Sequence, residues 1–287
     1  MKYKMICLMI FSAILLIACS TDNDSGKPVI MSVKSDLYVI AIGDTTMIKC
    51  FATDDKPEDQ LNYQWQINSE ILPGNDNTLK WIAEAEKGYS LLKCTVRDQD
   101  DHQAEMAIML IVVDSYDNVY QQAVTDASTP DTLDIYNHLS AISSSNSNLI
   151  WEGVPGHSRV LVSTYTKYAA SYQNSIGDTL STVWGINWVT VGQELKSFVN
   201  NSLVTENKLN LRIRQILGLP PTNQANYIVE LWVYPNDLFR PARDPEIDDN
   251  VCQLYFPANV SPEHQNWFNE NLLSSYGNNG YPWTQMG

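Results

Sequence analysis

Between residues 28 and 114 the sequence is made of short segments in which apolar and polar residues alternate. This pattern constrains the fold most, because successive side chains of a strand point to opposite faces of a sheet. Turn signals such as Gly43-Asp44 and Pro73-Gly74 separate the segments. We expect strands at residues 29–33, 37–42, 45–53, 62–68, 78–82, 89–97 and 103–113. Seven short strands in a segment of this length predict a two-sheet sandwich.

Two cysteines and a tryptophan lie within these strands, at Cys50, Trp65 and Cys94. This order resembles the immunoglobulin fold, in which the tryptophan packs on a disulfide between the two sheets. The resemblance implies a Cys50–Cys94 disulfide, since thiols at suitable positions oxidise outside the cytoplasm. The ending "CTVRDQDDHQAEMAIMLIVV" also resembles the last hairpin of bacterial Ig-like and PKD-like surface modules. Leu92 departs from the pattern, because it stands at the position of the tyrosine corner.

The first 18 residues are typical of a secretory signal peptide. Lys2 and Lys4 precede an apolar stretch, residues 5–17, that is shorter than the roughly 20 residues of a membrane-spanning helix. The run "LIAC" resembles the bacterial lipobox, which implies cleavage before Cys19 and lipidation of that residue. Residues 19–27 would then form a lipid-anchored tether at the outer membrane, facing the cell surface or the periplasm. The alternative is an ordinary signal peptide that contains a cysteine.

The acidic residues that follow Cys19 resemble the export signal of Bacteroidota surface lipoproteins.

Composition agrees with a folded protein that does not bind nucleic acid. Of the residues, 44% are hydrophobic and 18% are charged, and 33 carboxylates against 18 Lys and Arg give a formal charge of −15. Nucleic-acid binding requires a basic surface.

Residues 115–287 have a different pattern, with mixed helices and strands. We expect helices at 116–124, from Thr129 through "PDTLDIYNHL", at 207–217 and from Ser261 onward, and strands at 158–168, 181–191 and 227–234. Without β-α-β alternation these elements predict an α+β domain. The fold class is therefore an all-β Ig-like sandwich followed by an α+β domain. The stretches "WVTVGQELKSF", "LRIRQILGLPP" and "VELWVYPNDLFRPARDPEI" resemble a domain that recurs in uncharacterised bacterial secreted proteins. This resemblance implies a family but assigns no chemistry to the domain.

Acidic residues gather in two loops that leave the same end of such a sandwich. Asp54 and Asp55 lie in one loop, and Asp98, Asp100 and Asp101 lie in the other. Carboxylate oxygens suit Ca²⁺, so these side chains are candidate ligands for it, although no EF-hand spacing is present. The alternative is a solvated acidic surface without cofactor.

The candidates for catalysis are few. His157 follows a Gly-Pro-Gly turn at the start of a strand, where it could act as a general base with Glu152 or Glu194 and with Cys252 as nucleophile. No phosphate-binding loop, zinc-protease or nucleophile-elbow motif is present. The alternatives are a surface histidine and an unpaired, half-buried thiol.

The second domain is rich in tryptophan, and aromatic faces can stack on sugar rings. Strand patterns around Trp188 and Trp232 predict core positions for both. Tyr281 and Trp283 lie in a Gly- and Asn-rich segment and are candidates for an exposed ligand-binding patch. The alternative for these two residues is a tail packed on the domain.

These observations predict a cell-surface lipoprotein that presents a ligand-binding domain on an Ig-like spacer, with polysaccharide as the leading ligand. One alternative is a secreted hydrolase that uses His157 with a carboxylate or Cys252. Another is an adhesive or structural protein that contacts surface proteins. Fold and location alone do not decide between these functions.

Overall fold

The computed structural model describes residues 26–56, 60–84, 86–173, 175–180 and 185–274. The chain forms two compact units that divide between Val119 and Tyr120, and the segment Asn201–Lys208 is grouped with the first unit. In the described part of the chain, no helix combines the length and apolar character needed to cross a membrane.

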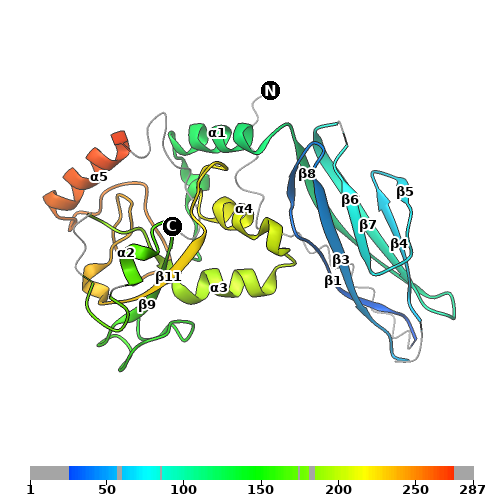
Figure 1. Cartoon of the computed structure of the whole chain (residues 1–287), viewed down its shortest axis with the longest axis horizontal. Helices are drawn as coiled ribbons and strands as arrows, with labels where there is room; N and C mark the ends of the chain where they lie inside the picture. Colours follow the sequence, from blue (N-terminus) through cyan, green and yellow to red (C-terminus); the bar gives the residue numbers. More distant parts are fainter. Residues whose placement is uncertain (1–25, 57–59, 85, 174, 181–184, 275–287) are drawn as a thin grey trace. The chain divides into compact units, whose positions relative to one another are not determined.

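The first unit is a sandwich of two sheets (Figure 1). One sheet has the order β1-β3-β6, and the other has the order β2-β8-β7-β4-β5. β2 runs parallel to β8, and the other neighbours are antiparallel. The strands are β1 Val29–Ser35, β2 Val39–Ala41, β3 Thr45–Thr53, β4 Asn62–Ile67, β5 Glu70–Leu72, β6 Thr78–Ile82, β7 Gly88–Arg97 and β8 Gln103–Val113. This unit confirms the all-β half of the predicted fold class.

One strand of the sandwich, β5, was not predicted. It has three residues, its burial does not alternate, and its only pairing partner is β4. The turn before it places Asn68 and Ser69 at φ values of 46° and 82°. Asn is one of the residues that tolerate the left-handed region, but Ser rarely adopts it, so Asn-Ser does not predict a hairpin turn as Asn-Gly would.

Trp65 is at the centre of the sandwich and is fully buried. It pairs with Cys94 across β4 and β7, and its Nε1 donates a hydrogen bond of 3.0 Å to the carbonyl of Asp76. Cys50 and Cys94 are both buried free thiols, and they share a hydrogen bond that raises the pKa of Cys94. Leu92 is also fully buried, so an apolar core side chain stands where the immunoglobulin pattern has the tyrosine of the tyrosine corner. A covalent bond between the two cysteines stays a prediction.

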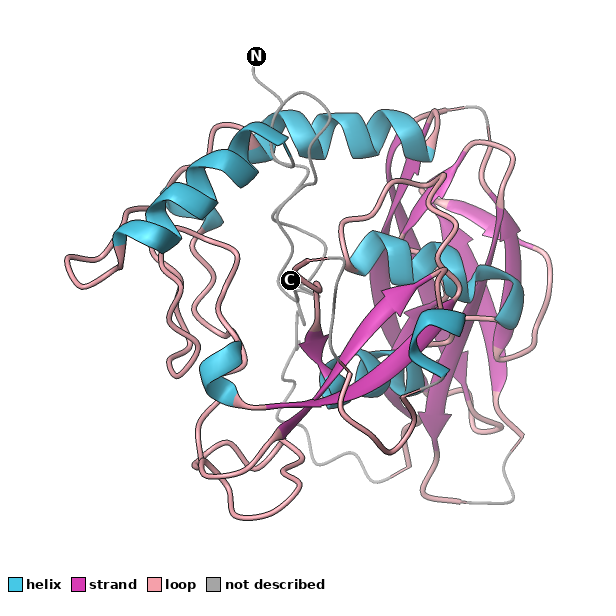
Figure 2. Ribbon diagram, turned by 60° about the vertical axis from the view of Figure 1, so that its left-hand side comes forward, coloured by secondary structure: helices cyan, strands magenta, loops and turns pink. Residues whose placement is uncertain are grey.

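The second unit contains a three-stranded antiparallel sheet of order β10-β9-β11, and much of its remaining chain is loop (pink in Figure 2). Val160, Val162 and Leu149 form its buried cluster, against which Leu231 and Val233 pack. The elements after β8 are α1 Tyr116–Ala127, η1 Thr132–Asp134, β9 Val160–Thr166, α2 Ala170–Gln173, β10 Thr190–Val191, α3 Gly192–Asn201, α4 Glu206–Ile216, β11 Tyr227–Val233, η2 Pro235–Asp237 and α5 Pro262–Ser274. This mixture confirms the α+β half of the fold class.

The helix expected from Thr129 onward is wrong, because only the single turn η1 forms there. Asp131, rather than Thr129, is the cap. Its carboxylate accepts from the Leu133 amide at 2.8 Å, while the Asp134 carboxylate accepts from the Asp131 amide at 2.7 Å. Ile135 then takes an extended conformation, which ends the turn. The capping residues are present, but no amphipathic helix follows them.

The strand expected at residues 181–191 is also wrong in its described part. Residues 185–189 are irregular, and only Thr190 and Val191 pair with β9. The chain then enters α3, which was not predicted. A Cβ at Gly192 would lie 3.3 Å from the Leu161 side chain, so this glycine allows α3 to begin directly against β9.

Trp188 and Trp232 are not core residues, contrary to prediction. Their exposed fractions are 48% and 39%. Trp232 lies opposite Leu161, on the face of the β9–β11 pair that points away from the Val160 cluster. Alternation along β11 correctly predicted a strand but did not indicate which face is buried.

We expect Cys50 and Cys94 to form a disulfide when the protein is produced in an oxidising compartment, because their thiols already touch inside the core. Closing a loop of this length stabilises a protein by roughly 4 kcal/mol. Peptide mapping of the full chain without reduction should find the two cysteine peptides linked, and reduction should lower the denaturation midpoint. Cys252→Ser is the matched control and should change neither result. Unlinked peptides from oxidised protein would contradict the prediction.

Candidate functional site

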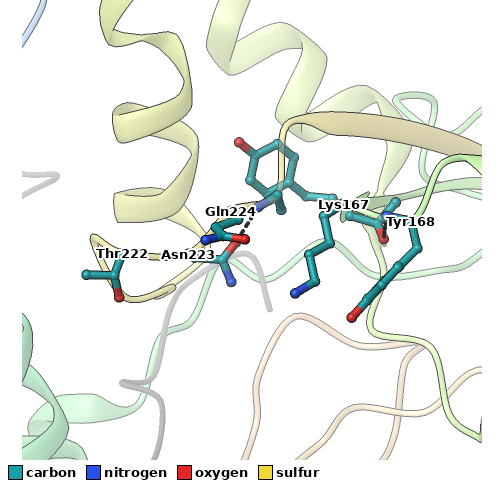
Figure 3. A pocket seen from close by; sticks show the side chains of 8 residues that line it. Lys167, Tyr168, Thr222, Asn223 and Gln224 are labelled. Carbon is teal, nitrogen blue, oxygen red and sulfur yellow. Dashed lines mark hydrogen bonds between the residues drawn. The ribbon is translucent and has the colours of Figure 1, made fainter.

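The second unit has an open pocket of about 420 Å³ at the end of β9 (Figure 3). This volume lies within the range of small-molecule binding sites. Lys167 and Tyr168 extend from the β9 side, while Thr222, Asn223 and Gln224 lie across from them (Figure 3). The pocket is lined by Tyr165, Thr166, Lys167, Tyr168, Thr222, Asn223, Gln224 and Ala225.

Backbone geometry positions both walls of the pocket. On one side, the Tyr168 amide donates to the Thr166 hydroxyl at 3.0 Å, which turns the chain at the end of β9. On the other side, the Asn223 side chain accepts from the Ala225 amide at 2.8 Å and closes a turn. The Asn226 amide donates to the Thr166 carbonyl at 3.3 Å, so the two walls are tied together.

The second wall begins where α4 ends. Gly218 has a φ of 62°, and the Leu219 amide donates to the Arg214 carbonyl at 2.8 Å. This geometry is a glycine C-cap, which the sequence "GLPP" predicted. The prolines that follow prevent a further helical turn, so the chain crosses to β11 through the polar residues of the pocket.

The exposed aromatic ring in the pocket belongs to Tyr168, whose exposed fraction is 61%. The Lys167 ammonium lies 5.0 Å from the centre of this ring. Asn223 and Gln224 are exposed or half-buried amides that can both donate and accept hydrogen bonds. A ring to stack on and amides beside it can bind a polyhydroxylated ligand. The lining residues that the structure describes include no carboxylate, histidine or cysteine.

Sequence reasoning missed this pocket. Its two segments, "TYTKY" and "TNQA", are far apart in the chain and contain no motif with a known chemistry. The one available signal was the polar, helix-stopping character of "GLPPTNQAN". That signal predicts a loop and does not reveal which strand end the loop approaches.

His157 lies in an exposed turn, where its backbone amide donates to the Val154 carbonyl at 3.0 Å. Its ring makes no hydrogen bond with any residue of the described chain. The nearby Glu152 forms a two-fold contact with Arg159 at 2.6 and 2.5 Å instead. The Glu152 carboxylate therefore pairs with Arg159 and does not orient the His157 ring.

Glu194 and Cys252 lie in separate environments. Burial on α3 raises the pKa of the Glu194 carboxyl, which accepts a hydrogen bond of 3.2 Å from the Ser140 hydroxyl. Burial also raises the pKa of the Cys252 thiol to about 11, and its Sγ lies 3.6 Å from the Asp244 carbonyl. A thiol with this pKa is a weak nucleophile at neutral pH. The described structure shows no hydrogen bond between His157, Glu194 and Cys252.

The two acidic loops of the sandwich lie side by side, joined by an ion pair of 2.5 Å between Lys56 and Asp100. Asp98 is buried and accepts from the amides of Asp100 and His102 at 2.9 and 2.8 Å. Its second oxygen lies 3.0 Å from His102 Nδ1. Asp54 accepts from the Lys56 amide at 3.1 Å. Most of these carboxylate oxygens thus have backbone amides or basic side chains as partners, while the second oxygen of Asp54 is buried without a hydrogen bond to a described residue.

The other two acidic candidates are exposed. Asp101 has a φ of 67° and lies 3.7 Å from Arg97, and Asp55 lies at the surface of its loop. Among the residues that the structure describes, no group of three or more acidic, histidine or cysteine side chains is arranged to hold a metal ion. Cys19, Tyr281 and Trp283 lie outside the described residues.

No protein-family model matches this chain, and neither does any curated protein. Similar solved structures include the CARDB domain of the PF1109 protein from Pyrococcus furiosus, in complex with di-metal ions (11% identity, 31% of this chain and 90% of that chain, TM-score 0.25). The PKD1 domain of the Vibrio cholerae metalloprotease PrtV is 16% identical over 30% of this chain and 96% of that domain, with a TM-score of 0.25. A structure of carbohydrate-binding modules from the beta-sandwich superfamily is 11% identical over 33% of this chain and 36% of that chain (TM-score 0.28).

We expect Glu194→Gln to stabilise the protein at neutral pH. Burial raises the pKa of this carboxyl in the folded state, so the folded state binds the proton more tightly and loses stability as pH rises through the raised pKa. Glutamine keeps the Ser140 hydrogen bond without a buried charge. Thermal unfolding should show a higher midpoint than wild type at about pH 7.5, and the difference should vanish below about pH 4.

Glu152→Gln is the matched control for this prediction. The hydrogen bond from Arg159 lowers the pKa of Glu152, so its loss should leave the neutral-pH midpoint unchanged or slightly lower. Equal gains from both variants would show that the effect is general charge reduction and not burial of Glu194.

Proposed function

We propose that the second unit is a ligand-binding domain that recognises carbohydrate at the pocket. The observation that carries the proposal is the exposed Tyr168 ring, which has Thr222, Asn223 and Gln224 across the pocket from it. A sugar ring stacked on Tyr168 would bury its apolar face, and its hydroxyl groups could pair with the amides. The Tyr168 amide is held by the turn at Thr166, so the backbone that carries the ring is positioned before the ligand arrives.

Binding without hydrolysis is the form of this function that the geometry favours. Hydrolysis of a glycosidic bond by the usual mechanism needs two carboxyl groups that flank the bond. The described part of the pocket lining contains no carboxyl group, and no hydrogen bond among described residues joins His157, Glu194 and Cys252.

We further propose that the protein is anchored by lipid at Cys19 and that the Ig-like unit serves as a spacer. The support is the sequence "LIAC" and the polar residues that follow it. A lipid anchor holds the chain at a membrane surface, and a folded spacer adds length without the entropy of a long flexible linker. A ligand-binding domain at the cell surface is in reach of polysaccharides that cannot enter the cell.

A second candidate function is adhesion to proteins. It is favoured by the outer face of β11, where Ile228, Trp232 and the neighbouring Tyr234 are 48%, 39% and 55% exposed. Exposed aromatic side chains are enriched at protein interfaces. A row of exposed apolar side chains suits a partner with a complementary surface more than a small polar ligand.

We expect the full chain, purified in detergent, to bind at least one member of a panel of purified glycans, and Tyr168→Ala to weaken that binding about tenfold or more, because the stacking surface is lost. Calorimetry measures both. Tyr255→Ala is the matched control, because Tyr255 is 64% exposed and does not line the pocket. Equal losses in both variants would contradict a role for the pocket.

We expect wild-type protein to incorporate a radiolabelled fatty acid and to partition into detergent. Cys19→Ser should abolish both, because the thioether that carries the lipid can no longer form. Cys252→Ser controls for nonspecific acylation of a thiol and should be labelled normally. Soluble, unlabelled wild-type protein would refute the anchor while leaving the pocket proposal untouched.

A further inference from the structure

We propose that the ligand of the pocket is an acidic carbohydrate, with a carboxylate or sulfate group that pairs with Lys167. This inference rests on the proposed function and adds the charge of the sugar. Among the described residues that line the pocket, Lys167 is the only charged one. The other described lining side chains are neutral, so these residues together provide one positive charge and no compensating negative charge.

Lys167 differs in this respect from about half of the basic residues of the described chain, for which an ion pair with a carboxylate is found. Lys56, Lys87, Lys93, Lys196 and Arg159 all form ion pairs with a carboxylate. Lys167 forms no such pair with a described residue, and its one recorded contact is with the face of Tyr168. The protein has 33 carboxylates and a net charge of −15, yet the Lys167 ammonium in the pocket pairs with none of the described carboxylates.

The position of the ammonium makes it part of any site that uses Tyr168. It lies 5.0 Å from the centre of the ring on which a sugar would stack, and its side chain extends in the same direction as that of Tyr168 (Figure 3). A ligand that covers the ring must therefore approach the ammonium and remove part of its hydration. That desolvation is unfavourable unless the ligand supplies a hydrogen-bond acceptor, and a charged acceptor compensates best.

The side-chain amides of Asn223 and Gln224 lie across the pocket from Lys167 and could also contact a bound sugar. Asn223 and Gln224 can hydrogen-bond the hydroxyl groups that all sugars share, so they do not distinguish acidic from neutral ligands. Lys167 is the side chain that can make this distinction. The rest of the protein is acidic and repels polyanions at long range, so the selectivity arises at this one contact.

The test compares probes that differ only in charge. Oligogalacturonate is paired with its methyl ester, and chondroitin sulfate is paired with desulfated, carboxyl-reduced chondroitin; neutral glycans complete the panel. Calorimetry with the full chain in detergent should show that the acidic member of at least one pair binds about tenfold or more tightly than its neutral partner. Lys167→Met should remove that preference, and Lys167→Arg should retain it.

Lys196→Met is the matched control, because it removes the same charge from a lysine that is paired with Glu230 outside the pocket. It should leave the preference intact. Binding of neutral glycans only, weakened by Tyr168→Ala but not by Lys167→Met, would overturn this inference and leave the proposed function standing. Failure to bind any glycan of the panel would contradict both.

Discussion

The second unit depends on the antiparallel pairing of β9 with β11. The register runs from Val160 opposite Val233 to Thr166 opposite Tyr227. Because opposite residues share a face, this register gathers Val160, Val162, Leu231 and Val233 over Leu149. A shift by one residue would turn Glu230 toward this cluster, which would bury an unpaired charge.

The same pairing creates the candidate site. When Thr166 is opposite Tyr227, the end of β9 meets the loop that enters β11. The turn after Thr166 then presents Tyr168, and the loop presents Asn223 and Gln224. The site thus forms at the edge of a rigid pair of strands, although every side chain that would touch the ligand comes from the irregular chain at its end. Binding residues are often found on loops that a scaffold positions in this way.

Charges elsewhere in the molecule illustrate why Lys167 stands apart. Asp98 is buried, yet one of its oxygens accepts hydrogen bonds from two backbone amides and the other lies beside the His102 ring. Glu152 forms an ion pair with Arg159, and Lys196 forms one with Glu230. The functional candidates of the sequence, His157 and Cys252, have no such organisation around them, since one ring is exposed and the other side chain is a protonated thiol against a carbonyl. Lys167 differs from the paired groups because no described carboxylate pairs with it, and from His157 and Cys252 because it lies beside an exposed aromatic ring in a pocket.

Local pattern predicted the sandwich well, because each strand there has one face in the core and one in water. Strands 45–53, 78–82 and 103–113 have the predicted ends. The second unit was harder, because its sheet is short and partly covered. Trp188 and Trp232 have strand-like neighbours but remain exposed, and the capping residues of η1 are followed by no helical pattern. Alternation indicates a strand, but only the partner strands decide which of its faces is buried.

The sequence by itself determined most strands of the sandwich and the end of α4 at Gly218, and its resemblance to the immunoglobulin fold indicated the approach of Cys50, Trp65 and Cys94. The strands and the helix end follow from local periodicity and backbone preference, which act over a few residues. Only the tertiary structure decided that Lys167 and Tyr168 face Asn223 and Gln224, and that His157, Glu194 and Cys252 have separate partners. Such contacts join distant parts of the chain, and they are set by strand register and packing, which no local pattern encodes.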